Sequence, residues 1–240
     1  MQQSSVEVVQ HDHGLNLTQS SFIADILNKF NMLDTSSVST SLSTSEILSL
    51  DDVNKLAQFQ HSPSTKHCQA TKRLLRYLKG TVTYGVHFKH GNSSQLHAYS
   101  DADWGGIPDT RHSTSAYVIF LGKNPISWCS TSNALLPDLQ QKQNTGLSQV
   151  FCDNIGVTYL CRNPVFHSRM KHVAIDFYFV HDQVESGKIS VHHIPTGAQL
   201  ANALTKALPR RSFDNLVSNI GLKQIESMLR GHVKDKNVES

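Results

Sequence analysis

The chain has 240 residues, of which 38% are hydrophobic and 17% are charged, and its formal net charge is +3 at pH 7. This length allows one large or two small domains, and the composition excludes both global disorder and a binder that is basic over its whole surface. No apolar run approaches a membrane span and no signal peptide opens the chain, so we expect an intracellular protein, in the cytoplasm or nucleus. Four cysteines without a Cys-x-x-Cys pair and 14 histidines without ligand spacing predict reduced thiols and no zinc site.

The first elements are a predicted hairpin and a helix. Residues 6–18 alternate as two strands around a turn at residues 11–14. An amphipathic helix should follow, capped by Ser20 or Ser21 and ended by Asn31.

A second helix is predicted to begin after Pro63, with Ser64 as its cap and Gly80 as its end. Leucines line one side of this helix, and basic residues line the other. Such basic residues can contact a phosphate backbone without sequence specificity, although a solvated helix face explains the same pattern equally well. The candidate nucleic-acid-binding residues are Lys72, Arg73, Arg76 and Lys79.

Strand patterns dominate the next part of the chain. They cover residues 82–88, 96–101, 116–121, 126–129 and 148–152. The second, third and fourth of these predict an antiparallel meander. Residues 130–147 break the pattern and fit neither a helix nor a strand.

Helices and one further strand are predicted after the meander. The helices cover residues 156–161 and 171–185, and a strand covers residues 188–194. Another helix should follow Thr196, with Leu200, Ala203 and Leu204 on it, and a polar tail should follow Leu222.

Acidic residues at two strand ends are candidates for chemistry. Asp101 and Asp103 end one predicted strand just before Gly105, and Asp153 ends a later strand. A carboxylate at a strand end beside glycines can hold a hard cation such as Mg²⁺. Turn-forming acids explain Asp101 and Asp103 equally well when these residues are taken alone.

Seven short motifs follow one another between residues 99 and 201. They are Tyr99-Ser100-Asp101-Ala102-Asp103-Trp104, Arg111-His112-Ser113-Thr114-Ser115, Ile126-Ser127-Trp128, Cys152-Asp153-Asn154, Asn163-Pro164-Val165-Phe166-His167-Ser168-Arg169, Lys171-His172 and Gln199-Leu200-Ala201. Together they resemble the ribonuclease H region of copia-type LTR retrotransposon Pol polyproteins. Upstream, residues 6–33 resemble the end of the reverse transcriptase, and residues 61–81 resemble the segment that joins it to ribonuclease H.

The resemblance implies a mixed α/β chain with a ribonuclease H-like fold around a mixed central sheet. It divides the chain into a reverse transcriptase remnant at 1–50, a connecting helix and strand at 51–94, a ribonuclease H-like domain at 95–213, and a polar tail at 214–240. The domain is expected to be truncated by an internal deletion around residues 130–147.

The resemblance also implies hydrolysis of the RNA strand of an RNA–DNA hybrid between two Mg²⁺ ions held by four carboxylates. The first carboxylate corresponds to Asp101 and the third to Asp153. The second, a glutamate on the deleted helix, has no counterpart, and the fourth position holds Asn202. We therefore expect one weakly held Mg²⁺, or Mn²⁺ in its place, and lost or severely weakened cleavage. Asn202 could offer a neutral oxygen, and Asp103 or Asp176 could substitute as ligands.

Three alternatives remain open from the sequence. One is residual ribonuclease H activity with Mn²⁺, and another is a non-catalytic module that binds a hybrid or other nucleic acid through the basic helix around Arg73 and Arg76. The third is a decayed copy that forms no stable protein. The missing helix should leave an apolar face of the sheet exposed. No membrane partner is expected, and the oligomeric state is not predicted.

Overall fold

The structure is a computed structural model. It describes residues 6–41, 65–91, 94–103, 114–131, 147–162 and 184–225. These residues form two sheets, a five-stranded sheet with most of the core and a four-stranded sheet beside it. No helix among them is both long enough and apolar enough to cross a membrane.

The four-stranded sheet has the order β1-β2-β3-β9 and is antiparallel throughout. Its strands are β1 (Glu7–His11), β2 (Gly14–Thr18), β3 (Tyr84–Lys89) and β9 (Leu222–Gln224). The predicted hairpin is confirmed. Its turn requires glycine at Gly14, because φ there is +150° and a Cβ atom would lie 1.8 Å from the carbonyl oxygen of Phe88.

Two helices precede the five-stranded sheet in the chain and lie side by side. They are α1 (Ser20–Lys29) and α3 (Thr65–Gly80). Asn31 follows α1 with φ of +53°, as a residue that ends a helix can. The predicted cap of α1 is wrong, because the Ser20 hydroxyl donates to the Val82 carbonyl oxygen at 2.7 Å and the N-cap residue is Gln19. The Ser21 backbone N–H in the first turn instead donates to the Glu7 carboxylate at 2.9 Å. Ser64, the predicted cap of α3, lies outside the described residues.

The five-stranded sheet has the order β6-β5-β4-β7-β8. Its strands are β4 (Leu96–Asp103), β5 (Thr114–Leu121), β6 (Asn124–Thr131), β7 (Leu147–Cys152) and β8 (Ser190–His193). The first three form the predicted antiparallel meander, whereas β7 runs parallel to both β4 and β8. The mixed sheet confirms the expected ribonuclease H-like fold.

The segments after the sheet strands agree only in part with expectation. Helix α5 (Ile155–Arg162) confirms the predicted helix after β7. Residues 132–146 and most of the predicted helix 171–185 lie outside the described part of the chain.

The helix predicted after Thr196 is split in two, into η4 (Thr196–Ala198) and α7 (Asn202–Thr205). It breaks because Gln199 between them is extended, with φ of −75° and ψ of 103°. Helix α8 (Arg210–Ile220) was not predicted, and its end and β9 lie within the stretch 214–240 that was predicted as a polar tail. Leu216 and Ile220 of α8 are buried, so this stretch contributes to the core.

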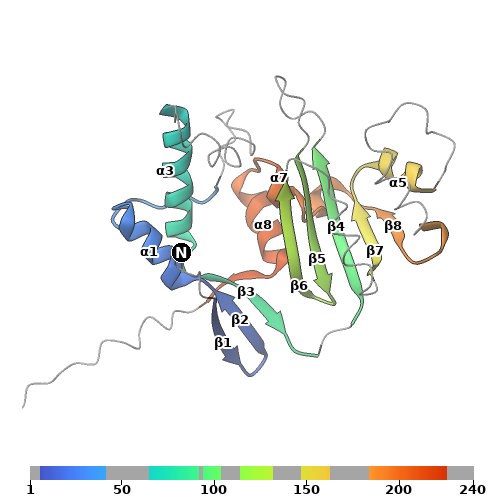
Figure 1. Cartoon of the computed structure of the whole chain (residues 1–240), viewed down its shortest axis with the longest axis horizontal. Helices are drawn as coiled ribbons and strands as arrows, with labels where there is room; N and C mark the ends of the chain where they lie inside the picture. The colour runs from blue at the N-terminus through green and yellow to red at the C-terminus, as the bar shows by residue number, and fades with distance from the viewer. Residues whose placement is uncertain are drawn as a thin grey trace, which may run out of the picture.

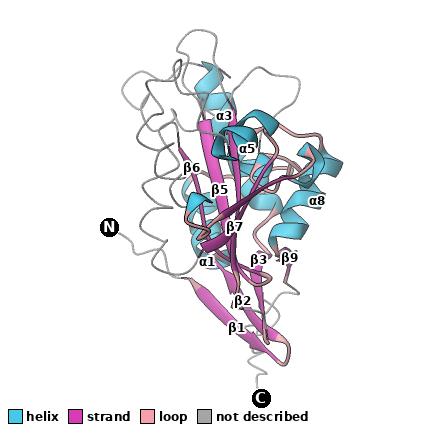
Figure 2. Ribbon diagram, turned by 90° about the vertical axis from the view of Figure 1, so that its right-hand side faces the viewer, coloured by secondary structure: helices cyan, strands magenta, loops and turns pink. Residues whose placement is uncertain are grey.

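Both faces of the central strands are buried. On one face a cluster runs across the sheet and includes Leu96, Ala98, Tyr117, Ile119, Ile189 and Val191, and on the other a second cluster includes Val118, Phe120, Leu200, Leu216 and Ile220. Figure 2 shows the helices and the strands of the described part from the side. The expectation of an exposed apolar face is therefore wrong for the centre of the sheet, because these side chains of β5 are buried on both faces.

The C-terminal segment is fixed to the sheet by one buried side chain. The Gln199 amide is fully buried, and its Nε2 atom donates to the carbonyl oxygens of Ser100 in β4, at 2.9 Å, and Phe151 in β7, at 3.3 Å. Its Oε1 atom accepts from the backbone N–H of Ala201 at 3.2 Å. Gln199 thus ties two parallel strands to the turn that begins α7.

The core packing predicts a large cost for truncating Ile119. This side chain has 0% exposure, so Ile119→Ala should lower the free energy of unfolding by about 2–5 kcal/mol. The matched control is Ile126→Ala in β6, where the side chain is 45% exposed and the loss should be much smaller. Urea unfolding of both variants measures the difference, and equal losses would contradict this packing.

The three hydrogen bonds of the buried Gln199 amide, here called the Gln199 bridge, should also contribute to stability. Gln199→Leu removes one acceptor and two donor contacts while roughly keeping the volume, so it should cost about 2–3 kcal/mol of unfolding free energy. Gln10→Leu, on the exposed edge of β1, should change stability by no more than about 0.5 kcal/mol. A neutral effect of Gln199→Leu in thermal or urea unfolding would mean that the bridge does not hold the segment.

Candidate functional site at the ends of β4 and β7

Asp101 lies near the end of β4 and is buried, with 3% exposure. Its Oδ2 atom accepts a hydrogen bond of 2.5 Å from the Thr205 hydroxyl of α7. Its Oδ1 atom lies 3.3 Å from the Lys206 ammonium. A buried carboxylate is costly unless it is paired, and here a hydroxyl and a cation from the C-terminal segment both contact it.

Asp153 immediately follows β7 and lies near the same edge of the sheet, because β4 and β7 are parallel neighbours. One of its oxygen atoms, Oδ2, is 3.9 Å from the Lys206 ammonium. The two predicted strand-end carboxylates are thus brought together around one cation.

Asn202 opens α7 and has 2% exposure. Its Nδ2 atom donates to the Thr196 carbonyl oxygen at 2.9 Å, which fixes the orientation of the amide. Its Oδ1 atom then accepts from the Lys206 ammonium at 2.6 Å. The carbonyl oxygen that could have served as a neutral ligand is already paired.

Sequence analysis missed Lys206, whose ammonium contacts Asp101, Asp153 and Asn202. A signal existed, because Lys206 is four residues after Asn202 and such residues lie on one side of a helical turn. Two carboxylates and one ammonium give this group a formal charge of −1.

The pKa of the Cys152 thiol, next to Asp153, is affected by the charges of the same group of residues. Its pKa is raised, first by burial and then by the charges of Asp153 and Asp101. A hydrogen bond with the Asn154 backbone and the charge of Lys206 oppose this rise. The thiol is therefore a poor nucleophile and a poor metal ligand at neutral pH.

The described residues do not fit a pair of Mg²⁺ ions. No group of three or more Asp, Glu, His or Cys side chains with metal-ligand geometry occurs among them. Asp103 ends β4 but its side chain is not described, and Asp176 lies outside the described residues. The donor set that remains is two carboxylates that already contact an ammonium.

The predicted nucleic-acid-binding residues lie on α3, beside α1 and not at this site (Figure 1). Most of them contact the segment after α1: Arg73 donates to the Thr40 hydroxyl, Arg76 to the backbone and hydroxyl oxygens of Ser36, and Lys79 to the Thr35 carbonyl oxygen. Lys72 is exposed. The basic face therefore has a structural role, and its role in binding stays a prediction.

No protein-family model matches the chain. Among curated proteins, it is 38% identical to the retrovirus-related Pol polyproteins from transposons RE1 and RE2 of Arabidopsis thaliana, over 275 positions that include 92% of the chain. It is 28% identical to that from transposon TNT 1-94 of Nicotiana tabacum, over 71% of the chain. The chain spans 19% of the length of the RE1 and RE2 proteins.

Two solved structures are similar at low identity. The N-terminal RNase H domain of Rv2228c from Mycobacterium tuberculosis, fused to maltose-binding protein, is 12% identical with a TM-score of 0.37, over 52% of this chain and 98% of that one. The foamy viral protease-reverse transcriptase in complex with dsDNA is 14% identical with the same TM-score, over 78% of this chain and 40% of that one. These scores are too low to place individual residues.

The alignments with the RE1 and RE2 proteins support the expectation that this chain lacks residues present in its relatives. They run over 275 positions, more than the 240 residues of this chain, so these relatives carry residues that the chain lacks. The position of the missing residues stays a prediction.

On sequence identity over nearly its whole length, the chain belongs to the retrovirus-related Pol polyproteins of copia-type transposons, of which it represents one segment.

Proposed function

We propose that this chain is a Pol-derived, ribonuclease H-like protein in which hydrolysis of the RNA strand of an RNA–DNA hybrid is lost or severely weakened. The observation that carries the proposal is the Lys206 ammonium, which lies within 3.9 Å of oxygen atoms of Asp101, Asp153 and Asn202. A cation of the chain itself thus stands among the groups that would have to bind metal. Such hybrids form inside the cell, in the cytoplasm or nucleus, where we place the protein.

The charge balance supports this proposal. Two divalent ions about 4 Å apart repel each other by roughly 16 kcal/mol at an effective dielectric constant near 20, and ligand charge must offset that repulsion. The group around Lys206 supplies a formal charge of only −1. A single Mg²⁺ or Mn²⁺ would need the ammonium to move away, so it would be held weakly.

Residual hydrolysis with Mn²⁺ is the second candidate function. It is favoured by the position of Asp101 and Asp153, which still lie together at one edge of the sheet as two-metal chemistry requires.

A third candidate is binding of a hybrid or another nucleic acid without cleavage. Its support on α3 is the exposed Lys72, because Arg73, Arg76 and Lys79 contact the segment after α1.

Cleavage of an end-labelled RNA–DNA hybrid tests the proposal. In Mg²⁺ and then in Mn²⁺, the chain and its Asp101→Asn variant should both give no cleavage above the rate without protein. Cleavage that appears in Mn²⁺ and disappears in Asp101→Asn would establish the second candidate instead. Binding of the same hybrid is measured by fluorescence anisotropy, and affinity that falls steeply with salt would support the third.

Metal binding tests the charge argument without any activity. Asn202→Asp adds a carboxylate and Lys206→Met removes the ammonium, so each variant should bind Mn²⁺ at least about tenfold more tightly, which is about 1.4 kcal/mol. Asn215→Asp, on an exposed position of α8, makes the same change in net charge away from the site and serves as the control. Calorimetry or Mn²⁺ electron paramagnetic resonance measures the affinity. Equal affinities in Asn202→Asp and Asn215→Asp would contradict the argument.

A further inference from the structure

A separate pocket of about 320 Å³ lies at the other end of β4, between the five-stranded sheet, α8 and the strands β3 and β9. His97 and Tyr99 of β4 contribute to its lining, and Asp101 follows on the same strand. At roughly 3.3 Å per strand residue, His97 and Asp101 are about 13 Å apart along β4. The volume falls in the range of small-molecule sites, which is about 300–1,000 Å³.

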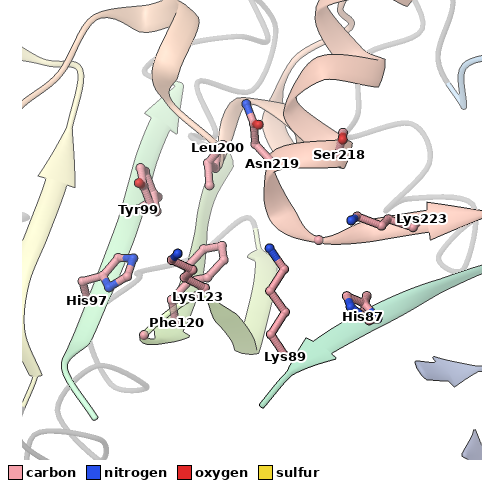
Figure 3. Close-up of a pocket in the computed structure, with 12 residues that line it drawn as sticks. His87, Lys89, His97, Tyr99, Phe120, Lys123, Leu200, Ser218, Asn219 and Lys223 are labelled. Carbon is pink, nitrogen blue, oxygen red and sulfur yellow. The ribbon is translucent and has the colours of Figure 1, made fainter. Parts of the chain in front are cut away.

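Three lysines from three different elements meet at this pocket. Lys89 ends β3, Lys123 lies in the turn between β5 and β6, and Lys223 belongs to β9. In Figure 3, Lys89 and Lys223 extend toward the same space. No acidic residue is found among the described residues that line it. Like charges repel, so their gathering from distant parts of the chain favours a negatively charged ligand.

Aromatic rings form the opposite wall. His97 stacks on Phe120 with ring centroids 5.2 Å apart and an angle of 4° between the planes, and Tyr99 meets Phe120 edge-on at 5.7 Å. Phe120 is buried beneath them, whereas His97 and Tyr99 are only half-buried. Figure 3 shows these rings on β4 and β5, across the pocket from Lys223. Exposed ring surface beside cations suits a ligand that carries a flat aromatic group as well as charge.

Hydrogen bonds hold the walls of the pocket together. The side-chain amide of Asn124 accepts from the Lys89 backbone N–H at 2.8 Å and donates to the Lys89 carbonyl oxygen at 3.0 Å. The backbone N–H of His87 donates to the carbonyl oxygen of Gly221 at 2.9 Å. These bonds join the end of β3 to the start of β6 and β3 itself to the residue that follows α8. The pocket is therefore formed before a ligand arrives, which lowers the entropy cost of binding.

The electrostatics of His87 agree with this geometry. Its pKa is lowered, first by burial and then by the charges of Lys223, Lys89, His11 and His13. The imidazole thus lies in a region of positive potential, where a bound anion would be stabilised.

We propose that this pocket binds a nucleoside phosphate, with the phosphate at Lys89, Lys123 and Lys223 and the base against the rings of His97 and Tyr99. Two sources share this chemistry, a free nucleotide and a single nucleotide of a nucleic acid strand. The site is separate from Asp101 and Asp153, so the proposal does not rest on the function proposed above.

Calorimetric titration of the whole chain in a chelating buffer tests this site. The probes are inorganic phosphate, adenosine, adenosine 5′-monophosphate and a single strand of five deoxyadenosine nucleotides. We expect the monophosphate to bind more tightly than phosphate or adenosine alone. The double variant Lys123→Ala with Lys223→Ala should bind the monophosphate about tenfold or more weakly, because each substitution removes a charge-assisted contact with the phosphate. Lys188→Ala, on an exposed loop, is the control and should leave the affinity unchanged.

Each remaining outcome decides a part of the proposal. Absence of monophosphate binding, or binding that is equal in the double variant and in Lys188→Ala, would overturn it. Phosphate that binds as tightly as the monophosphate, or unchanged affinity in His97→Leu, would overturn the assignment of the base to the aromatic wall. Tighter binding of the strand than of the monophosphate identifies a strand as the source, and the reverse identifies a free nucleotide. Circular dichroism verifies the fold of every variant.

Discussion

The buried amide of Gln199 is the interaction on which the candidate site depends. Its side chain bonds to the carbonyl oxygens of Ser100 and Phe151, which belong to two parallel strands, and to the backbone that enters α7. The carboxylates come from the strands, whereas Asn202 and Lys206 come from the segment after Gln199. The relative position of the two sets therefore follows from one fully buried amide, whose hydrogen-bonding groups would be costly to bury unpaired.

Lys206 places a side-chain ammonium beside both carboxylates of the same site. A metal ion leaves and returns with its concentration, whereas a side-chain ammonium is covalently attached and is present at every metal concentration. The protein thus neutralises part of the charge of Asp101 and Asp153 without a cofactor, and the cost of bringing these carboxylates together is met within the chain. On the function proposed above, the contacts that pair these carboxylates would also oppose the binding of a metal ion.

Local patterns in the sequence predicted most strands, and with them the positions of Asp101 and Asp153. Alternation and turn residues are local signals, so the hairpin and the meander agree with the structure. The contacts of Lys206 could not be predicted in this way, because they depend on how a distant segment returns to the sheet. The contacts of the basic residues of α3 have the same origin. Their pattern is typical of a solvated or phosphate-binding face, and only the structure shows that three of them hold the segment after α1.

The pairing of β9 with β3 has a consequence for how the protein is made. Leu222 pairs with Val86, although the two are far apart in the sequence. A ribosome releases the N-terminal strands first, so the edge of β3 stays open while the whole five-stranded sheet is being synthesised. An open strand edge is a template for pairing with another chain. During synthesis β1, β2 and β3 are thus vulnerable to aggregation until β9 has been made and pairs with β3.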